Sequence, residues 1–177
     1  MDSSLAPQQD EHRLVMRVLA RWRALADGRG LPRRSQIDPR AFGDDWRHCL
    51  LIDLDPRAER SRLAFVGEGL RDPSWPTFER QAITDCQKDS LLHLATSYVA
   101  RVAAKGVPIS SGGVGMHHSM PIVYRSILLP LSEGGGKIDG LLGAANYREI
   151  PVTEDVHAFR EHPGADALLT EFHVAGG

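Results

Sequence analysis

The sequence is poor in cysteine, has no long apolar run and carries no large excess of either charge. Two cysteines among 177 residues, Cys49 and Cys86, are too few for a disulfide framework and form no CxxC pair, which favours a reduced protein. The polar start MDSSLAPQQDEH lacks the apolar core of a secretory signal, and no run approaches membrane-spanning length. The net charge of −2 excludes a general binder of polyanions. We therefore expect a cytoplasmic protein that binds neither nucleic acid nor membrane.

Motifs for nucleotide binding and for catalysis are absent as well. The run GGVG at residues 112–115 matches neither GxxxxGK followed by Ser or Thr nor GxGxxG. We interpret it as a glycine-rich hairpin connection and not as a phosphate cradle. Neither GxSxG nor HExxH occurs. The sequence thus predicts a protein that is not an enzyme.

The hydrophobic pattern indicates one domain that combines helices with an antiparallel sheet. An amphipathic helix at residues 11–27 is followed by two strands, short helical pieces, a long helix ended by Gly106, and three more strands. The predicted strands are 48–55, 61–67, 107–111, 122–131 and 138–147, and the long helix spans 85–105. This order favours an α+β fold. We divide the chain into a helix extension (1–30), a domain (31–150) and a polar tail (151–177), with a helix start expected at 153–155.

The N-terminal helix carries an apolar stripe that needs a partner. The stripe consists of Val15, Val18, Trp22 and Leu25, flanked by Leu14 and Leu19. A helix of this length is marginal alone in water, so we expect it to cover the sheet face that bears Tyr124, Ser126 and Leu128. We also expect part of the stripe, anchored by Trp22, to contact a second protomer in a two-fold homodimer. The rival prediction is a monomer in which the helix packs wholly on its own sheet.

Three arginines lie one turn apart on a flank of the same helix. They are Arg13, Arg17 and Arg21. We interpret them as the solvated edge of an amphipathic helix, and the alternative is an anion-binding strip.

Three stretches together resemble one group of PAS domains. They are RWRALADGRGLPRRSQIDPRAF (21–42), RLAFVGEGL (62–70) and ILLPLSEGGGKIDGLLGAANYRE (127–149). In this order they are similar to the PAS_5 type, a family of small bacterial stand-alone PAS-like proteins. The segment 72–90 departs from the family pattern. No bound cofactor is therefore carried over, and the cofactor stays unknown.

The resemblance implies a fold and a class of function. The fold is a PAS-like α+β domain with a five-stranded antiparallel sheet, helices on one face and an N-terminal amphipathic helix. The function is that of a non-catalytic sensory or ligand-binding module in bacterial signalling. Its partner is then an unidentified small molecule or a signalling protein.

One cation lies on an otherwise apolar strand face. By strand alternation, Arg125 shares its face with Val123, Ile127, Leu129 and Leu131. Such a charge needs a partner. Either it reaches water at the rim, or it pairs with a polar or anionic ligand in the PAS pocket between helix and sheet. Tyr98 on the long helix and Asn146 on the last strand are further candidates for this pocket.

Three histidines are candidate ligands for a metal or a haem. His117 and His118 are adjacent, so in an extended backbone they point to opposite faces and do not easily share one ion. Loop histidines are the simpler interpretation, and the alternatives are a metal site or, from another class, a metal-dependent hydrolase that uses them. His93 lies four residues after Asp89, which favours a helix-surface pair over two ligands of an ion. Since some PAS domains hold haem through a histidine at this position, the resemblance also implies a haem-binding alternative for His93.

The two cysteines are not expected to carry photochemistry. Cys86 lies at the predicted helix start, where a thiolate gains from the helix N-terminus. The run TDCQ at 84–87 does not match the Asn-Cys-Arg-Phe-Leu-Gln run of light-sensing PAS proteins. Cys49 lies inside an apolar strand and is interpreted as a core residue.

Overall fold

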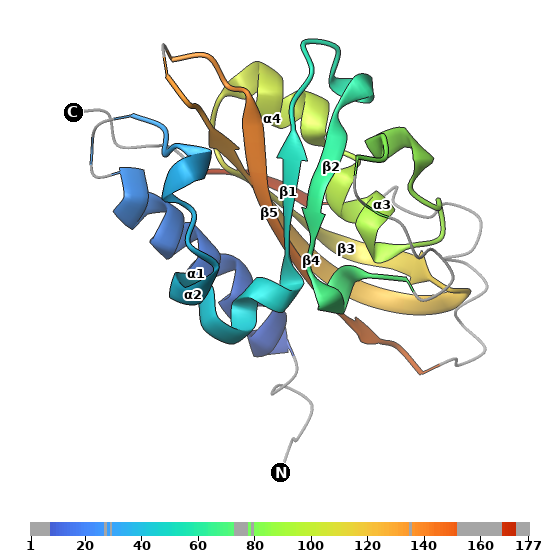
Figure 1. Cartoon of the computed structure of the whole chain (residues 1–177). Helices are drawn as coiled ribbons and strands as arrows, with labels where there is room; N and C mark the ends of the chain where they lie inside the picture. Colours follow the sequence, from blue (N-terminus) through green and yellow to red (C-terminus); the bar gives the residue numbers. More distant parts are fainter. Residues whose placement is uncertain are drawn as a thin grey trace.

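A single twisted antiparallel sheet of six strands, with helices on both faces, organises the chain (Figure 1). The computed structural model describes residues 8–151 and 168–172, except for 27, 29, 73–77, 79 and 135. The strands are β1 (Cys49–Asp53), β2 (Arg62–Val66), β3 (Ile109–His117), β4 (Met120–Leu131), β5 (Gly140–Glu149) and β6 (Leu168–Glu171). Their order across the sheet is β2-β1-β5-β4-β3-β6, and every neighbouring pair is antiparallel.

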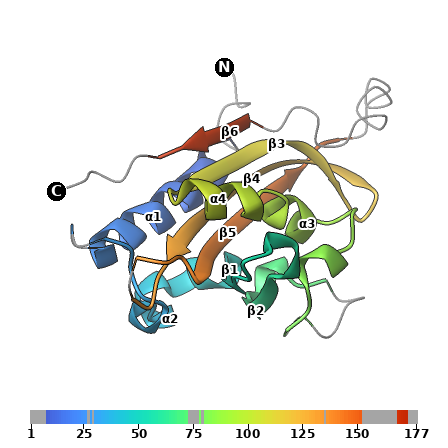
Figure 2. The same ribbon diagram turned by 90° about the horizontal axis from the view of Figure 1, so that it is seen from above.

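Helices of two kinds connect the strands. The α-helices are α1 (Gln8–Ala26), α2 (Pro39–Phe42), α3 (Leu91–Thr96) and α4 (Val99–Lys105). The short 3-10 helices are η1 (Arg34–Gln36), η2 (Gly43–His48), η3 (Ala58–Arg60), η4 (Glu68–Leu70) and η5 (Ile83–Asp85). Viewed from above, α1 lies on one side of the sheet and α3 and α4 on the other (Figure 2). None of the helices within the described ranges is long and apolar enough to cross a membrane.

The helix α1 packs its apolar stripe onto β4 and β5. The cluster joins Leu14, Val15, Val18, Leu19 and Trp22 to Ile127, Leu129, Leu131, Leu142 and Ala144. Trp22 is fully buried, and its indole N–H donates a hydrogen bond of 2.9 Å to the carbonyl of Pro130. The helix therefore covers the sheet face opposite to the predicted one. Tyr124 and Leu128 belong to the other core, beneath α3 and α4.

The same packing corrects the predicted dimer contacts. Val15, Val18 and Trp22 are 2%, 0% and 0% exposed within a single chain, so they have no surface left for a second protomer. Leu25 is only partly buried. The stripe packs on the chain's own sheet, because an apolar stripe gains the same burial there as from a neighbour.

The opposite face is covered by two short helices instead of the predicted long one. The helix α3 begins only at Leu91, because the hydroxyl of Ser90 accepts the backbone N–H of His93 at 3.1 Å and caps it. Ser97 and Tyr98 then separate α3 from α4. Gly106 ends α4 in the left-handed conformation (φ +70°), which confirms it as the predicted stop.

The glycine run 112–115 lies inside β3 and is not the predicted hairpin connection. The turn between β3 and β4 consists of His118 and Ser119, both with positive φ (49° and 63°). Close packing accounts for two of the glycines. A Cβ on Gly115 would lie 2.6 Å from the side chain of Leu94, and one on Gly112 would lie 3.2 Å from the side chain of Arg125.

A sixth strand corrects both the predicted strand number and the predicted tail. The strand β6 pairs with β3 at the sheet edge, from Ile109↔Glu171 to Gly112↔Leu168. It lies in the stretch 151–177 that was predicted to be a polar tail. The helix start expected at 153–155 lies outside the described residues.

Candidate ligand-binding pocket

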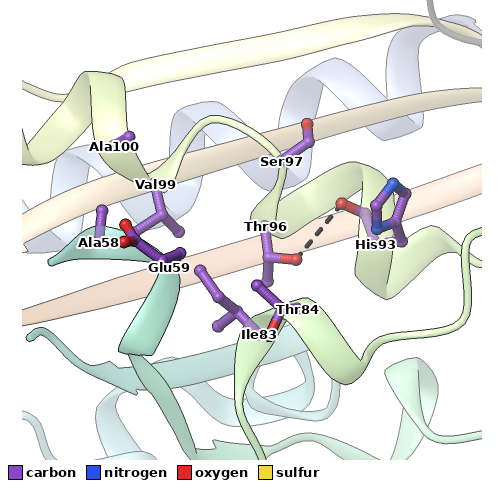
Figure 3. Close-up of a pocket in the computed structure, with 9 residues that line it drawn as sticks. All are labelled: Ala58, Glu59, Ile83, Thr84, His93, Thr96, Ser97, Val99 and Ala100. Carbon is purple, nitrogen blue, oxygen red and sulfur yellow. Dashed lines mark hydrogen bonds between the residues drawn. The ribbon is translucent and has the colours of Figure 1, made fainter.

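A pocket of about 300 Å³ opens between η3, η5 and the junction of α3 with α4 (Figure 3). Its lining residues are Ala58, Glu59, Ile83, Thr84, His93, Thr96, Ser97, Val99 and Ala100. Ile83 and Val99 are buried and form an apolar floor, whereas Glu59, Thr84 and Ser97 are exposed. The pocket thus combines an apolar base with a polar rim, which is the usual composition of small-molecule sites.

Local hydrogen bonds shape the helical wall of the pocket. The hydroxyl of Thr96 donates to the carbonyls of Leu92 and His93 at 2.9 and 3.3 Å, and the hydroxyl of Ser97 donates to that of Leu94 at 2.9 Å. Such bonds from Ser and Thr back to the preceding turn compete with the helical ladder. They place Thr96 and Ser97 at the point where α3 ends.

The opposite wall is held by the strand β2. The segment before η5 runs beside this strand, with a bridge between Arg62 and Ala82. The N–H of Ile83 donates to the carbonyl of Ser61 at 3.0 Å. The connection between β1 and β2 contributes Glu59 through η3. Three separate parts of the chain therefore meet around one small space.

Hydrogen-bond acceptors dominate the polar side of the pocket. The hydroxyl hydrogen of Ser97 is used within the helix, so its lone pairs accept, and the Glu59 carboxylate accepts only. Partial burial lowers the pKa of His93 below its ordinary 6.5, with a smaller contribution from the positive charge of Lys88. A neutral His93 ring offers one donor and one acceptor.

Of the four predicted ligand-binding residues, only His93 lines this pocket. Tyr98 points to the sheet, where it is fully buried and its hydroxyl lies 2.9 Å from the hydroxyl of Ser126. Burial raises the pKa of Tyr98. The space between helix and sheet, where the pocket was expected, is therefore filled by side chains such as Tyr98 and Leu94.

Arg125 and Asn146 lie on the other face of the sheet. They are direct cross-strand partners on β4 and β5, and Gly112 lies opposite Arg125 on β3. Their face is the one covered by α1, since Ile127 and Ala144 beside them pack against that helix. The side-chain oxygen of Asn146 is buried without a hydrogen-bond partner in the part of the chain that is described. The structure brings these two together but separates them from His93.

His117 and His118 are engaged by neighbouring groups of the chain. Their rings lie against each other, with centroids 4.1 Å apart, and not on opposite faces, because His118 is in the turn. Nε2 of His118 faces Asp72 at 3.3 Å, and Nδ1 of His117 accepts the backbone N–H of Leu91 at 3.0 Å. Within the described ranges, no three His, Cys, Asp or Glu residues are grouped so that they could hold a metal ion.

The predicted pair of Asp89 with His93 does not form either. Asp89 precedes α3, and its carboxylate accepts the backbone N–H of Ser119 at 2.6 Å. Cys86 does not lie at the start of this helix, which begins five positions later at Leu91. Burial raises the pKa of Cys86 to about 11 and that of Cys49 to about 12, so both thiols are unreactive near neutral pH.

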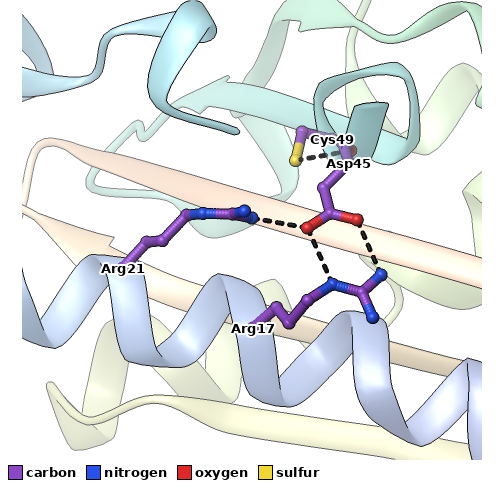
Figure 4. Close-up of polar contacts among 4 residues, drawn as sticks. All are labelled: Arg17, Arg21, Asp45 and Cys49. Atoms are coloured by element: carbon purple, nitrogen blue, oxygen red, sulfur yellow. Dashed lines mark hydrogen bonds and ion pairs between the residues drawn. The ribbon is translucent and has the colours of Figure 1, made fainter. Parts of the chain in front are cut away.

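An ion-pair cluster beneath α1 was missed by the sequence analysis (Figure 4). Asp45 in η2 is 8% exposed and accepts two hydrogen bonds from Arg17, at 2.9 and 2.7 Å, and one from Arg21 at 2.5 Å. The hydrogen bond from Arg17 is the main reason why the pKa of Asp45 is lowered. Two of the three helix arginines thus bind an anion, but it is a carboxylate of the same chain.

Comparison with known proteins identifies a family. The family model PAS_5, described as a PAS domain, matches residues 10–146. No curated protein matches the chain, and no solved structure matches it.

Proposed function

Because the chain belongs to the PAS_5 family of PAS domains, we propose that it is a non-catalytic sensory module that binds a small molecule in the pocket around His93. PAS domains are in general sensory or ligand-binding modules. The observation that carries the proposal is a pocket whose polar groups have hydrogen-bonding capacity left over. The ring of His93 makes no hydrogen bond to any described residue, and the exposed hydroxyl of Ser97 keeps lone pairs that can accept.

The chemistry of the lining favours a ligand that carries donors. Glu59 and Ser97 present acceptors, and Glu59 adds a negative charge. An anionic ligand would meet this carboxylate and find no Lys or Arg in the lining. The ligand class is therefore a small, partly apolar amine or amino alcohol. A volume of about 300 Å³ limits it to the lower end of small-molecule ligands.

The same pocket fits a haem poorly. His93 would be the axial ligand, but the pocket volume is at the lower end of the range for small-molecule sites, and Glu59 faces it. An absorption spectrum of the purified protein checks this directly. A haem band lost in His93→Ala would replace the small-molecule proposal by a haem sensor, and a signalling protein would remain the proposed output partner in either case.

The test compares matched amines and carboxylates on two variants. Short aliphatic amines, amino alcohols and carboxylates of equal length are titrated into 15N-labelled protein, and amide shifts are followed at Thr84, Ser97 and Ala100. We expect amines and amino alcohols to shift these amides and carboxylates not to. Ala100→Phe, which fills the pocket, should weaken binding by about tenfold or more, because an added ring excludes the ligand's volume.

The control is Ala104→Phe, one turn further along α4. Ala104 is exposed and does not line the pocket. This variant should bind as the original chain does. Equal binding to both phenylalanine variants, or no shift at the pocket with any compound, would contradict the proposal.

A further inference from the structure

The turn between β3 and β4 is fastened to the start of α3 by a set of hydrogen bonds. The N–H of His118 donates to the carbonyl of Asp89 at 3.1 Å, and the N–H of Ser119 donates to the Asp89 carboxylate at 2.6 Å. From the helix side, the N–H of Leu91 donates to Nδ1 of His117 at 3.0 Å. The hairpin and the helix, which are 26 positions apart in the chain, therefore act as one unit.

The bond to His117 depends on the protonation state of its ring. The first N–H groups of a helix have no partner within the helix. In α3, the hydroxyl of Ser90 accepts the N–H of His93, and Nδ1 of His117 accepts the N–H of Leu91. Nδ1 accepts only while it carries no proton, so the contact needs the neutral ring with its hydrogen on Nε2. A proton on Nδ1 turns the acceptor into a donor that faces another donor.

Charged and titratable groups face His117 from every element that packs against it. The ring of His118 lies at 4.1 Å and that of Tyr147 on β5 at 4.7 Å, measured between centroids. Burial is the main cause that lowers the pKa of His117, and His118 lowers it further. Three acidic groups oppose this shift: Asp72 after η4, Asp89 before α3 and Glu149 on β5. Because the pKa lies below the ordinary 6.5, the neutral ring is the main form at pH 7.

We propose that His117 is a proton-sensitive latch, in which protonation of Nδ1 breaks the bond to Leu91 and releases the start of α3 from the β3–β4 turn. The two hydrogen bonds from the N–H groups of His118 and Ser119 to Asp89 remain, so the release is local and does not unfold the sheet. The helix that is released carries His93 and Thr96 of the pocket wall. An effect of His117 protonation on ligand binding in the pocket rests on the proposed function. The release of α3 from the turn does not rest on it.

Two measurements without ligand test the latch. The first is the 15N spectrum of the His117 ring, which distinguishes the two neutral forms, and we expect the hydrogen on Nε2. The second is the amide-exchange protection factor of Leu91 and its neighbours in α3 between about pH 8 and about pH 5. Protection should fall roughly threefold to tenfold as His117 titrates, the factor for loss of one ordinary hydrogen bond.

Three variants separate the latch from a purely structural role. His117→Asn keeps an acceptor near the Nδ1 position but does not titrate, so protection should be high and independent of pH. His117→Phe keeps a ring without an acceptor, so protection should be low at every pH. His118→Gln leaves the Leu91 contact in place and removes the neighbouring imidazole that lowers the pKa of His117, so the fall in protection should remain and move to higher pH.

Several results would overturn the latch. One is a neutral His117 ring with its hydrogen on Nδ1. Another is protection at Leu91 that stays constant while His117 titrates, or a ring that stays neutral until the whole chain unfolds. Because the first measurement and His118→Gln need no change at residue 117, the latch remains testable if the His117 variants fail to fold. If no amine binds in the titration, the ligand proposal is wrong, but the measurements on His117 and Leu91 still test the latch.

Discussion

The two faces of the sheet are covered in different ways. On one face, a single helix of 19 residues buries most of an apolar stripe and is fixed by Trp22 and by the Arg17–Asp45 pair. On the other, two helices of 6 and 7 residues meet at a break, leave a pocket beside it and depend on polar contacts. The first face is built for fixed packing, and the second combines packing with the pocket and the polar contacts on which the two proposals rest. Four changes test this difference.

The largest effect is expected on the α1 face, from Trp22→Ala. This change removes a fully buried ring and its hydrogen bond to Pro130, so the free energy of unfolding should fall by about 3–5 kcal/mol. Urea denaturation measures it. The control Met16→Ala, at a position 38% exposed on the same helix, should change stability by about 0.5 kcal/mol or less. A loss below about 1 kcal/mol for Trp22→Ala would mean that the α1 face is not closed.

The ion-pair cluster should contribute less than Trp22. Asp45→Asn should lower the free energy of unfolding by about 1–2 kcal/mol, because Arg17 and Arg21 are partly solvated. Since Arg17 lowers the pKa of Asp45, the stabilisation is full above the ordinary value of 3.8 and is lost as the pH falls through the folded-state value. The difference between the two proteins should therefore vanish in strong acid. Asp44→Asn, at the exposed neighbour, is the control, and an equal loss there would contradict the assignment.

On the second face, Tyr98→Phe tests the buried hydroxyl pair. The change removes the bond of 2.9 Å to Ser126 and keeps the ring, so a loss of about 1 kcal/mol is expected. Chemical denaturation with Tyr147→Phe as a half-buried control measures it. A loss as large as that of Trp22→Ala would erase the contrast between the faces.

The smallest effect at neutral pH is expected from His93→Gln. Partial burial lowers the pKa of His93 below 6.5, so the unfolded chain takes up a proton at higher pH than the folded one. Stability should then fall as the pH drops below about 6.5, and part of this fall should disappear in the variant. Near pH 8 the two proteins should differ by a few tenths of a kcal/mol. Thermal unfolding at several pH values checks this. If the stability of the two proteins falls equally as the pH drops, His93 is not the group involved.

Local signals in the sequence were enough for most of the fold. Alternating apolar residues located β1, β2, β4 and β5, and Gly106 located the end of α4. The break between α3 and α4 was missed, because an apolar period continues through Ser97 and does not show which carbonyls the hydroxyls bind. The strand β6 was missed because four residues carry too little pattern to stand out.

Long-range contacts account for the errors at the candidate site. Alternation showed correctly that Arg125 shares a face with Ile127, but it contains no information about which helix covers that face. The partners Arg17 and Asp45 are 28 positions apart, and no local pattern joins them. His93, which lines the pocket, was predicted as a candidate because it lies on a helix of the family layout. The η3 and η5 walls were not found, because they come from loops that pack together only in the folded chain.

The hydrogen bond between Trp22 and Pro130 also bears on how the chain folds while it is being synthesised. Its two residues are 108 positions apart, so the ribosome makes α1 long before the strands that α1 needs. At about 5–20 residues per second, this interval lasts roughly 5–20 s. During that time the stripe of α1 is an exposed apolar surface and a natural target for chaperones. The helix that is made first among the described elements is therefore among the last to be buried.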